Sequence, residues 1–257
     1  MYAVSIAGPG ADRVAEELAE RAEGRVGTVR TEADGEKRRW TETGDRTECV
    51  VGGDRSDGER PVRAALDRLA PDHEYAFVSD APEARLPTVA VGGTREEAAV
   101  SVSEPPAFDP ASALEAVRDT EPYETLESLV AEVKRSDLAA YSGAIATFTG
   151  RVRAKEDEAD ERTRCLEFEK YDGVAEDRMA TIEAELEERA GVLDVRLHHR
   201  TGRILDGEDI VFVVVLAAHR GEAFDAVEDG IDRLKEEVPL FKKEVTDDEA
   251  FWVHQRE

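Results

Sequence analysis

Short apolar runs alternate with helical patterns along the first hundred residues. Residues 2–7 form an apolar run that ends in a Gly-Pro-Gly turn at residues 8–10. Residues 12–22 then carry apolar side chains at helical spacing, with Asp12 as the predicted N-cap. The same pattern predicts strands at residues 24–29, 49–51, 75–78 and 88–91 and a helix at residues 62–69. Alternating strands and helices are typical of a parallel sheet with helices on both faces, so we predict a three-layer α/β domain.

The regular pattern stops between residues 102 and 122, where four prolines lie among acidic and small residues. Polar segments rich in proline are typical of loops. We therefore predict a first domain at residues 1–103, a linker at residues 104–121 with a short helix at residues 112–118, and a second domain at residues 122–257.

The second domain is predicted to mix strands with three helices. The helices are expected at residues 125–133, 174–190 and 223–238, and the strands at residues 144–149, 165–168, 192–199, 210–218, 241–245 and 251–253. The strand at residues 210–218 is apolar throughout, which predicts a central position in its sheet. The acidic segment KEDEADE at residues 155–161 is predicted to be a solvated loop.

The charge of the chain excludes two classes of partner. There are 60 Asp and Glu residues against 34 Lys and Arg, a formal net charge of −26. Nucleic acid and anionic membranes are bound by basic surfaces, so we expect neither partner. Only seven of the basic residues are lysines, and an acidic chain with few lysines is typical of proteins from salt-loving microbes. In such a chain, a lysine on an apolar periodic segment is a candidate functional residue.

The cysteines and the first residues of the chain indicate where in the cell the protein is expected. Cys49 and Cys165 lie far apart and match no metal-binding or redox spacing, so we expect reduced thiols in a cytoplasmic protein and no bound metal. The first residues, MYAVSIAGPG, have no basic segment before the apolar run and do not predict a signal peptide. No apolar stretch approaches the length of a membrane span.

The turn at residues 8–10 stands where a phosphate-binding P-loop would lie, between a strand and a helix. A working P-loop ends in Gly-Lys-Ser/Thr, whereas this chain continues Ala11-Asp12-Arg13. A carboxylate at a helix N-terminus would repel a phosphate. The basic run Lys37-Arg38-Arg39 either binds an anion or is a solvated face. We therefore expect a degenerate domain with a binding or structural role and no nucleotide hydrolysis.

Two cationic clusters in the second half favour an anionic ligand. Arg151 and Arg153 follow a strand and lie two residues apart, a spacing that suits a phosphate or carboxylate, or else two exposed ion pairs. His219 and Arg220 stand between the apolar strand and a helix, a common position for an anion in α/β proteins. A histidine in that position is also commonly structural.

Two lysine clusters follow, with three of the seven lysines within nine residues. Lys235 lies beside the apolar face of the last helix, and Lys242-Lys243 follow Pro239-Leu240-Phe241. Partial burial and neighbouring cations turn a lysine into a general base or an amine nucleophile. Alternatively, Lys235 complements the dipole at the C-terminal end of its helix.

Taken together, these clusters resemble the large, catalytic subunit of molybdopterin synthase. The motifs GAIATFTGRVR at residues 143–153, HHRTGRILDGEDIVFVVVLAAHR at residues 198–220, RLKEEVPLFKKE at residues 233–244 and WVHQR at residues 252–256 occur in the order of that family. The resemblance covers about residues 122–257. The first 95 residues resemble, more weakly, the P-loop adaptor family of molybdopterin-guanine dinucleotide biosynthesis, through GRVGTVR, GEKRRWTETG and LPTVAV.

The resemblance implies a specific reaction. The family's enzyme transfers sulfur to cyclic pyranopterin monophosphate and so forms the dithiolene of molybdopterin. The sulfur arrives as a thiocarboxylate on the C-terminal Gly-Gly tail of a small ubiquitin-like protein. The resemblance further implies an α/β-hammerhead fold, a homodimer within a heterotetramer, and no metal or other cofactor for this step. The alternative is a non-catalytic adaptor that binds the sulfur carrier or a molybdenum-cofactor enzyme.

The resemblance also assigns roles to individual residues. Lys235 and Lys242 match the two catalytic lysines. The substrate pocket would be lined by Phe148, Arg153, His219, Arg220 and Arg256, the last of these contributed in the family by the neighbouring subunit. The family usually has Trp before the second lysine, where this chain has Phe241, which keeps an apolar aromatic side chain.

Overall fold

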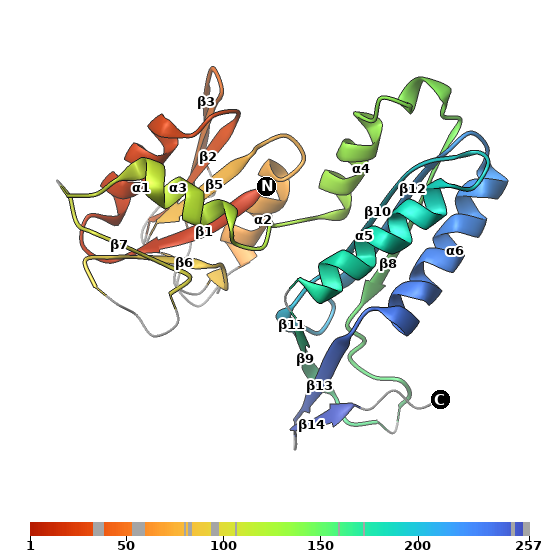
Figure 1. The fold of residues 1–257 in the computed structure, drawn as a ribbon. Coiled ribbons are helices and arrows are strands. Elements are labelled where there is room, and N and C mark those ends of the chain that lie inside the picture. Colours follow the sequence, from red (N-terminus) through yellow and green to blue (C-terminus); the bar gives the residue numbers. More distant parts are fainter. Residues whose placement is uncertain are drawn as a thin grey trace. The chain divides into compact units, whose positions relative to one another are not determined.

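The chain forms two compact units, Met1–Ser128 and Leu129–Glu257, each with a core of its own (Figure 1). The computed structural model describes residues 1–32, 39–52, 60–79, 81, 84–93, 98–105, 107–158, 160–171, 173–247 and 250–253. Arg256 and the basic residues Lys37 and Arg38 lie outside the described residues.

The first unit is built on a seven-stranded sheet in the order β3-β4-β2-β5-β1-β6-β7. Its strands are β1 (Tyr2–Ala7), β2 (Val26–Glu32), β3 (Arg39–Thr43), β4 (Arg46–Gly52), β5 (Tyr75–Ser79), β6 (Thr88–Val91) and β7 (Val100–Val102). Neighbouring strands run parallel except for β3, which pairs antiparallel with β4 at the edge. The outermost strands β3 and β7 were not predicted from the sequence, because β3 is mostly exposed and polar and β7 has only three residues.

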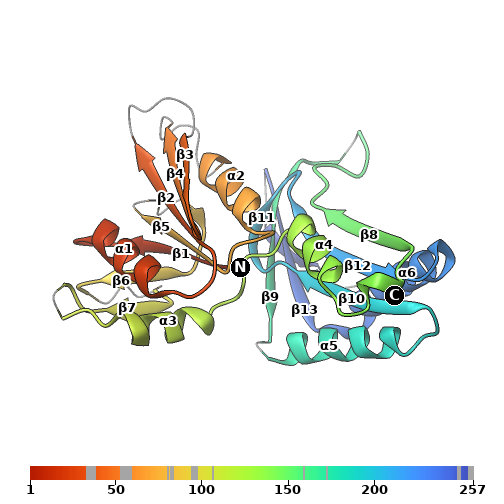
Figure 2. The ribbon, with the colours of Figure 1, turned by 90° about the horizontal axis from the view of Figure 1, so that it is seen from above.

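Helices cover both faces of this sheet. Helices α1 (Ala11–Arg21) and α3 (Pro110–Arg118) share one apolar cluster with Val4 and Ile6 of β1. Helix α2 (Arg60–Leu69) packs in a second cluster with Ala3, which points to the opposite face of the same strand. The first unit is therefore a mixed α/β domain with three layers, as the alternation of strands and helices predicted (Figure 2).

Two details differ from the sequence-based expectation. Gly10, not Asp12, is the N-cap of α1, because its left-handed backbone (φ 76°) starts the helix one residue earlier and leaves Asp12 in the first turn. The predicted linker at residues 104–121 contains α3, and Leu114 and Val117 of that helix are buried in the core of the first unit. These apolar contacts make the segment part of that core rather than a connection.

The second unit contains two antiparallel sheets and two long helices. A three-stranded sheet has the order β10-β12-β8 and a four-stranded sheet the order β11-β9-β13-β14. Their strands are β8 (Ala144–Arg151), β9 (Thr163–Lys170), β10 (Val192–His199), β11 (Gly202–Leu205), β12 (Asp209–Ala217), β13 (Leu240–Thr246) and β14 (Ala250–Val253). The other elements are the short η3 (Ala139–Tyr141), α5 (Val174–Glu187), α6 (Arg220–Glu237) and α4 (Leu126–Lys134), whose first three residues belong to the first unit. The apolar strand β12 is central, as predicted.

Helix α6 sets the positions of the candidate site residues. It begins directly after β12 and packs on the three-stranded sheet through buried side chains at helical spacing, among them Ala223, Val227, Ile231 and Leu234. Gly230 allows the close approach, since a Cβ atom there would lie 3.2 Å from Cγ1 of Val213. The chain therefore runs along β12 to one end of the sheet and returns along α6 to the other end, where β13 begins.

Candidate active site

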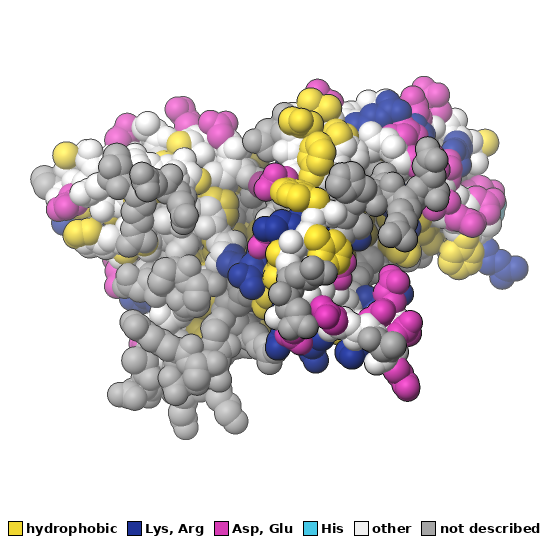
Figure 3. Space-filling view, turned by 90° about the horizontal axis from the view of Figure 1, so that it is seen from below, with side chains coloured by type: hydrophobic (Ala, Val, Ile, Leu, Met, Phe, Trp, Pro, Cys, Tyr) yellow, Lys and Arg dark blue, Asp and Glu magenta, His cyan; other side chains and the backbone are white. Residues whose placement is uncertain are grey.

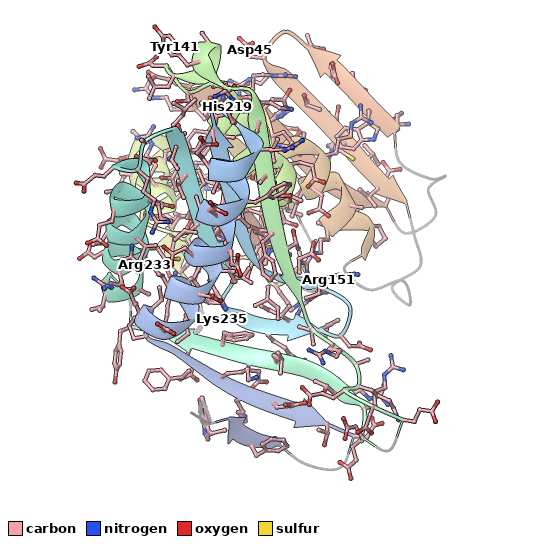
Figure 4. The ribbon with its side chains drawn as sticks, turned by 90° about the vertical axis from the view of Figure 1, so that its right-hand side faces the viewer. Asp45, Tyr141, Arg151, His219, Arg233 and Lys235 are labelled. Atoms are coloured by element: carbon pink, nitrogen blue, oxygen red, sulfur yellow. The ribbon has the colours of Figure 1, made fainter. Side chains whose placement is uncertain are left out.

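Lys235 lies in the last turn of α6, over an aromatic ring of β8. Its Nζ atom is 6.0 Å from the centre of the Phe148 ring, at the outer limit of a cation–π contact. Phe148 is partly buried against the core, whereas Lys235 is exposed. Figure 4 shows Lys235 near the end of α6 where the chain turns toward β13. The family resemblance predicts that both residues belong to one site, and the fold brings them together.

The two arginines after Phe148 have different surroundings. Arg151, the last residue of β8, forms an ion pair with Asp209 (Nε to Oδ1 3.0 Å) and donates a hydrogen bond to the carbonyl of Gly207. Arg153 lies beyond the strand, is exposed, and has Nη1 3.8 Å from a carboxylate oxygen of Glu156. Arg151 is therefore connected to the turn before β12 by two contacts, whereas Arg153 has a single ion pair at a longer distance.

Lys242 lies on β13, on the core-facing side of the four-stranded sheet. It stands opposite Phe168 of β9, which is buried in the core of the second unit, and directly opposite residues share a face. The side chain is partly buried, and no carboxylate of the described residues forms an ion pair with it. Its neighbour Lys243 points to the other face, where Nζ is 3.0 Å from a carboxylate oxygen of Glu167. Only Lys242 is thus placed toward the interior.

A buried histidine adjoins this region. The ring of His199 packs edge-on against Phe168, with 4.7 Å between the ring centres, and burial lowers the pKa of His199 to about 4. Its Nδ1 atom is 2.8 Å from the carbonyl oxygen of Arg200. The imidazole of His199 is therefore uncharged near neutral pH and packs against the side chain that stands opposite Lys242.

Lys170 is a residue that the sequence analysis missed. It ends β9 on the same face as Phe168, its side chain is only 9% exposed, and its Nζ is 2.5 Å from Oε1 of Glu176. Glu176 also accepts a hydrogen bond from the main-chain N–H of Gly173 and so caps α5. The sequence does contain a signal for Lys170. This lysine follows Leu166 and Phe168 at the two-residue spacing of one strand face, in a chain that has few lysines.

The outer side of the four-stranded sheet carries exposed aromatic side chains. Phe241 packs edge-on against Tyr171, with ring centres 5.4 Å apart, and Trp252 is exposed on the same face. Phe251, also exposed, stands opposite Glu244 and therefore lies on the face of Lys242. The face in Figure 3 shows hydrophobic side chains beside Lys and Arg side chains in the second unit. Large exposed apolar groups on a strongly acidic protein indicate contact with another molecule.

His219 and Arg220 lie at the opposite end of α6 from Lys235 (Figure 4). Both are exposed, and the side chain of His219, the N-cap residue, makes no capping hydrogen bond. Fifteen residues of one helix separate Arg220 from Lys235, about 22 Å at the rise of an α-helix. A single chain therefore does not bring these two residues to the same place as Lys235 and Phe148.

The described part of the chain offers no group of three or more His, Cys, Asp or Glu side chains that could hold a metal ion. Cys49 and Cys165 are both buried, unbonded thiols. None of the helices in the described ranges is long and apolar enough to cross a membrane.

Comparison with known proteins identifies the family to which the chain belongs. The family model of the MoaE protein matches residues 119–237. A "Probable molybdopterin synthase" of Haloferax volcanii is 50% identical over 263 residues that cover 100% of both chains. The "Molybdopterin synthase catalytic subunit" of Cereibacter sphaeroides is 42% identical over 122 residues, 48% of this chain and 81% of that protein.

A crystal structure of molybdopterin synthase from Staphylococcus aureus aligns with 52% of this chain and 93% of its own, at 33% identity and a TM-score of 0.46. The source of the full-length relative, Haloferax, agrees with the salt adaptation inferred from the acidic, lysine-poor composition. Because that relative matches from end to end at half identity, the chain belongs to the molybdopterin synthase family.

Proposed function

We propose that this protein is the catalytic subunit of molybdopterin synthase. It transfers sulfur from the thiocarboxylated C-terminus of a small ubiquitin-like protein to cyclic pyranopterin monophosphate and forms the molybdopterin dithiolene. The observation that carries this proposal is the end-to-end match to a probable molybdopterin synthase, with the family's motifs in order along the second unit. The buried, unbonded cysteines agree with a cytoplasmic location.

The lysines supply the proton transfers of this reaction. Lys235 stands over Phe148, and Lys242 shares a face of its sheet with Phe168, so each lysine lies next to an aromatic side chain. Addition of a sulfur nucleophile and opening of a cyclic phosphate both need proton donors and acceptors at fixed positions. We assign this acid–base work to Lys235 and Lys242, and the binding of the substrate phosphate to Arg153.

His219 and Arg220 serve the site of a second copy. They lie about 22 Å from Lys235 along one helix, which is too far for one small substrate to reach both. A homodimer, which the family resemblance implies, removes this separation if the start of α6 in one copy meets the end of α6 in the other. We therefore place His219 and Arg220, together with Arg256, in the substrate pocket of the partner subunit.

The Lys235→Ala variant tests the catalytic assignment. Wild-type protein, thiocarboxylated carrier and cyclic pyranopterin monophosphate are mixed in high salt, and the dithiolene product is measured. We expect Lys235→Ala to lower product formation at least 100-fold, the usual scale of losing a general acid or base, while it still binds the carrier. Lys243→Ala is the matched control, because Lys243 is paired with Glu167 on the opposite face of its sheet.

Two results would contradict the proposal. Undiminished product from Lys235→Ala would remove Lys235 from the catalytic role. A wild-type protein that binds the carrier and forms no product would instead favour a non-catalytic adaptor.

For the first unit we propose a P-loop-like domain that has lost nucleotide binding. The carboxylate of Asp12 lies in the first turn of α1 and accepts a hydrogen bond from Ser79 Oγ at 2.6 Å, so a negative charge is held where a phosphate would bind. The turn is also packed against β6, since a Cβ atom on Gly8 would lie 2.5 Å from the carbonyl oxygen of Val91.

A further inference from the structure

Four charged side chains join helices α5 and α6 close to Lys235. Arg233, near the end of α6, donates to Glu237 one turn later through two of its nitrogens (Nε to Oε1 2.7 Å, Nη2 to Oε2 3.4 Å). Arg233 also pairs with Glu185 of α5, and Glu237 pairs with Arg178 of α5. Each helix thus contributes one arginine and one glutamate to what we call the α5–α6 ion-pair cluster.

The two members on α6 are better fixed than an isolated surface pair. The side chains of Arg233 and Glu237 are 18% and 22% exposed. Isolated exposed ion pairs contribute little, whereas an arginine that meets a carboxylate at two points in a network has a defined geometry. Salt screens partly buried pairs at contact distance much less than exposed charges that lie further apart. The cluster is therefore expected to persist in concentrated salt.

Lys235 lies on the other side of α6 from the cluster. At 3.6 residues per turn, residues 233 and 237 project from one side of the helix, and residue 235 projects from the opposite side. The cluster contacts α5, whereas Lys235 stands over Phe148 of β8. In Figure 4, Arg233 lies on the side of α6 next to α5, and Lys235 lies on the side away from it. The cluster therefore holds this turn from behind the candidate site.

Apolar contacts hold the same turn without fixing its direction. Leu234 and Val238 are buried in the core of the second unit. Gly230, one turn earlier, allows a close approach to α5, because a Cβ atom there would lie 3.4 Å from Cδ1 of Leu186. Apolar attraction has no preferred direction, so it keeps α6 on its neighbours and leaves small rotations of the helix about its axis unopposed. The directional ion pairs to α5 oppose such a rotation.

We propose that Arg233 and Glu237 are positioning residues, which fix the direction in which Lys235 presents its ammonium group. The inference rests on the proposed function, in which Lys235 transfers a proton. A general acid or base works only within hydrogen-bond reach of the reacting atom. A displacement of about 1 Å can lower the rate about 100-fold. The end of a long side chain amplifies a small rotation of its helix, so the α5–α6 ion-pair cluster controls the rate without touching the substrate.

The Arg233→Ala variant tests the proposal in the product assay. We expect kcat to fall at least ten-fold, while KM for the sulfur carrier and KM for cyclic pyranopterin monophosphate each stay within two-fold. Arg189→Ala is the matched control. Arg189, just beyond α5, pairs with Asp229 of α6, so this variant removes an ion pair to the same helix about 9 Å along its axis from Lys235. It should keep kcat within two-fold of the wild type.

Reversal of the whole cluster distinguishes positioning from a direct effect of charge. A variant with Arg178→Glu, Glu185→Arg, Arg233→Glu and Glu237→Arg retains each ion pair and the net charge, but places the opposite charge at every position. We expect its kcat to return to within about three-fold of the wild type, whereas Arg233→Glu alone should be at least as slow as Arg233→Ala. Circular dichroism of each variant shows whether it is folded.

Amide hydrogen exchange measures the action of the cluster without the reaction. Local opening of a helix end exposes its main-chain N–H groups to exchange. We expect Arg233→Ala to speed the exchange of residues 234–238 at least ten-fold and to leave residues 224–228 unchanged. Arg189→Ala should leave residues 234–238 unchanged.

The outcomes separate this inference from the proposed function. An active wild type in which Arg233→Ala keeps its kcat, in which Arg189→Ala loses as much, or in which the folded four-fold reversal does not recover would overturn the positioning role alone. A wild type that forms no product would overturn the proposed function. In that case, faster exchange of residues 234–238 in Arg233→Ala would still support the hold of the cluster on this turn, and unchanged exchange would overturn it.

Discussion

At the scale of single residues, the chain uses arginine and lysine for different purposes. Arginines form most of the ion pairs in the described residues, for example Arg13 with Glu17 and Arg196 with Glu132. Lys235 and Lys242 instead adjoin aromatic side chains, and Lys170 is almost buried. An amine changes its protonation state far more readily than a guanidinium, so a chain that retains few lysines retains them where that property is needed.

Glu183 gives a prediction at this scale. Burial raises the pKa of Glu183 to about 7, against an ordinary value of 4.5. The folded state therefore holds the proton more tightly than the unfolded state. The stabilisation of the folded state by protonation of Glu183 is complete below pH 4.5 and is lost as the pH rises through 7. Above pH 7 the buried carboxylate lowers the free energy of unfolding by about 3 kcal/mol.

The Glu183→Gln variant removes this dependence. We expect it to be more stable than the wild type at pH 8 and about equally stable at pH 4.5, measured by urea unfolding in high salt at each pH. Glu188→Gln, an exposed glutamate on the surface beside α5, controls for the loss of one negative charge. A stability difference that stays the same from pH 4.5 to pH 8 would show that Glu183 does not titrate as described.

At the scale of elements, the sequence predicted those whose apolar pattern is strong and local. Residues 2–7, 88–91 and 192–199 were predicted as strands with the bounds that the structure gives them. The polar β3 and the four-residue β11 were missed, because their pairing with β4 and β9 decides their conformation. The resemblance to the family singled out Phe148, Lys235 and Lys242, and the fold places Phe148 beside Lys235. The resemblance could not show that His219 lies at the far end of α6, since that depends on how β12 and α6 pack.

The turn between β1 and α1 gives the prediction at this scale. With Asp12 held by Ser79 and Gly8 packed on Val91, the turn presents a carboxylate to any entering phosphate. We expect the full chain to show no heat of binding with ATP or GTP and Mg²⁺ in calorimetry at millimolar nucleotide. Binding in the micromolar range would contradict the loss of function in the first unit.

At the scale of the whole molecule, the net charge of −26 opposes both folding and the approach of two copies. At about 1 M salt, charges more than about 3 Å apart are largely screened, so this repulsion falls away. Main-chain hydrogen bonds and apolar contacts between two copies do not weaken with this screening. A dimer, and with it the shared site, is thus expected in concentrated salt.

The shared site makes a prediction that no single-chain site can meet. We mix two inactive variants, His219→Ala and Lys235→Ala, under conditions in which subunits exchange. A mixed dimer has one site with both residues changed and one site with both intact. With random exchange, half of the dimers are mixed, so about a quarter of the wild-type activity should return. Mixing Lys235→Ala with Lys242→Ala is the control and should restore nothing, because both lysines come from the same copy. If His219→Ala and Lys235→Ala exchange subunits and remain inactive, His219 acts within its own chain or not at all.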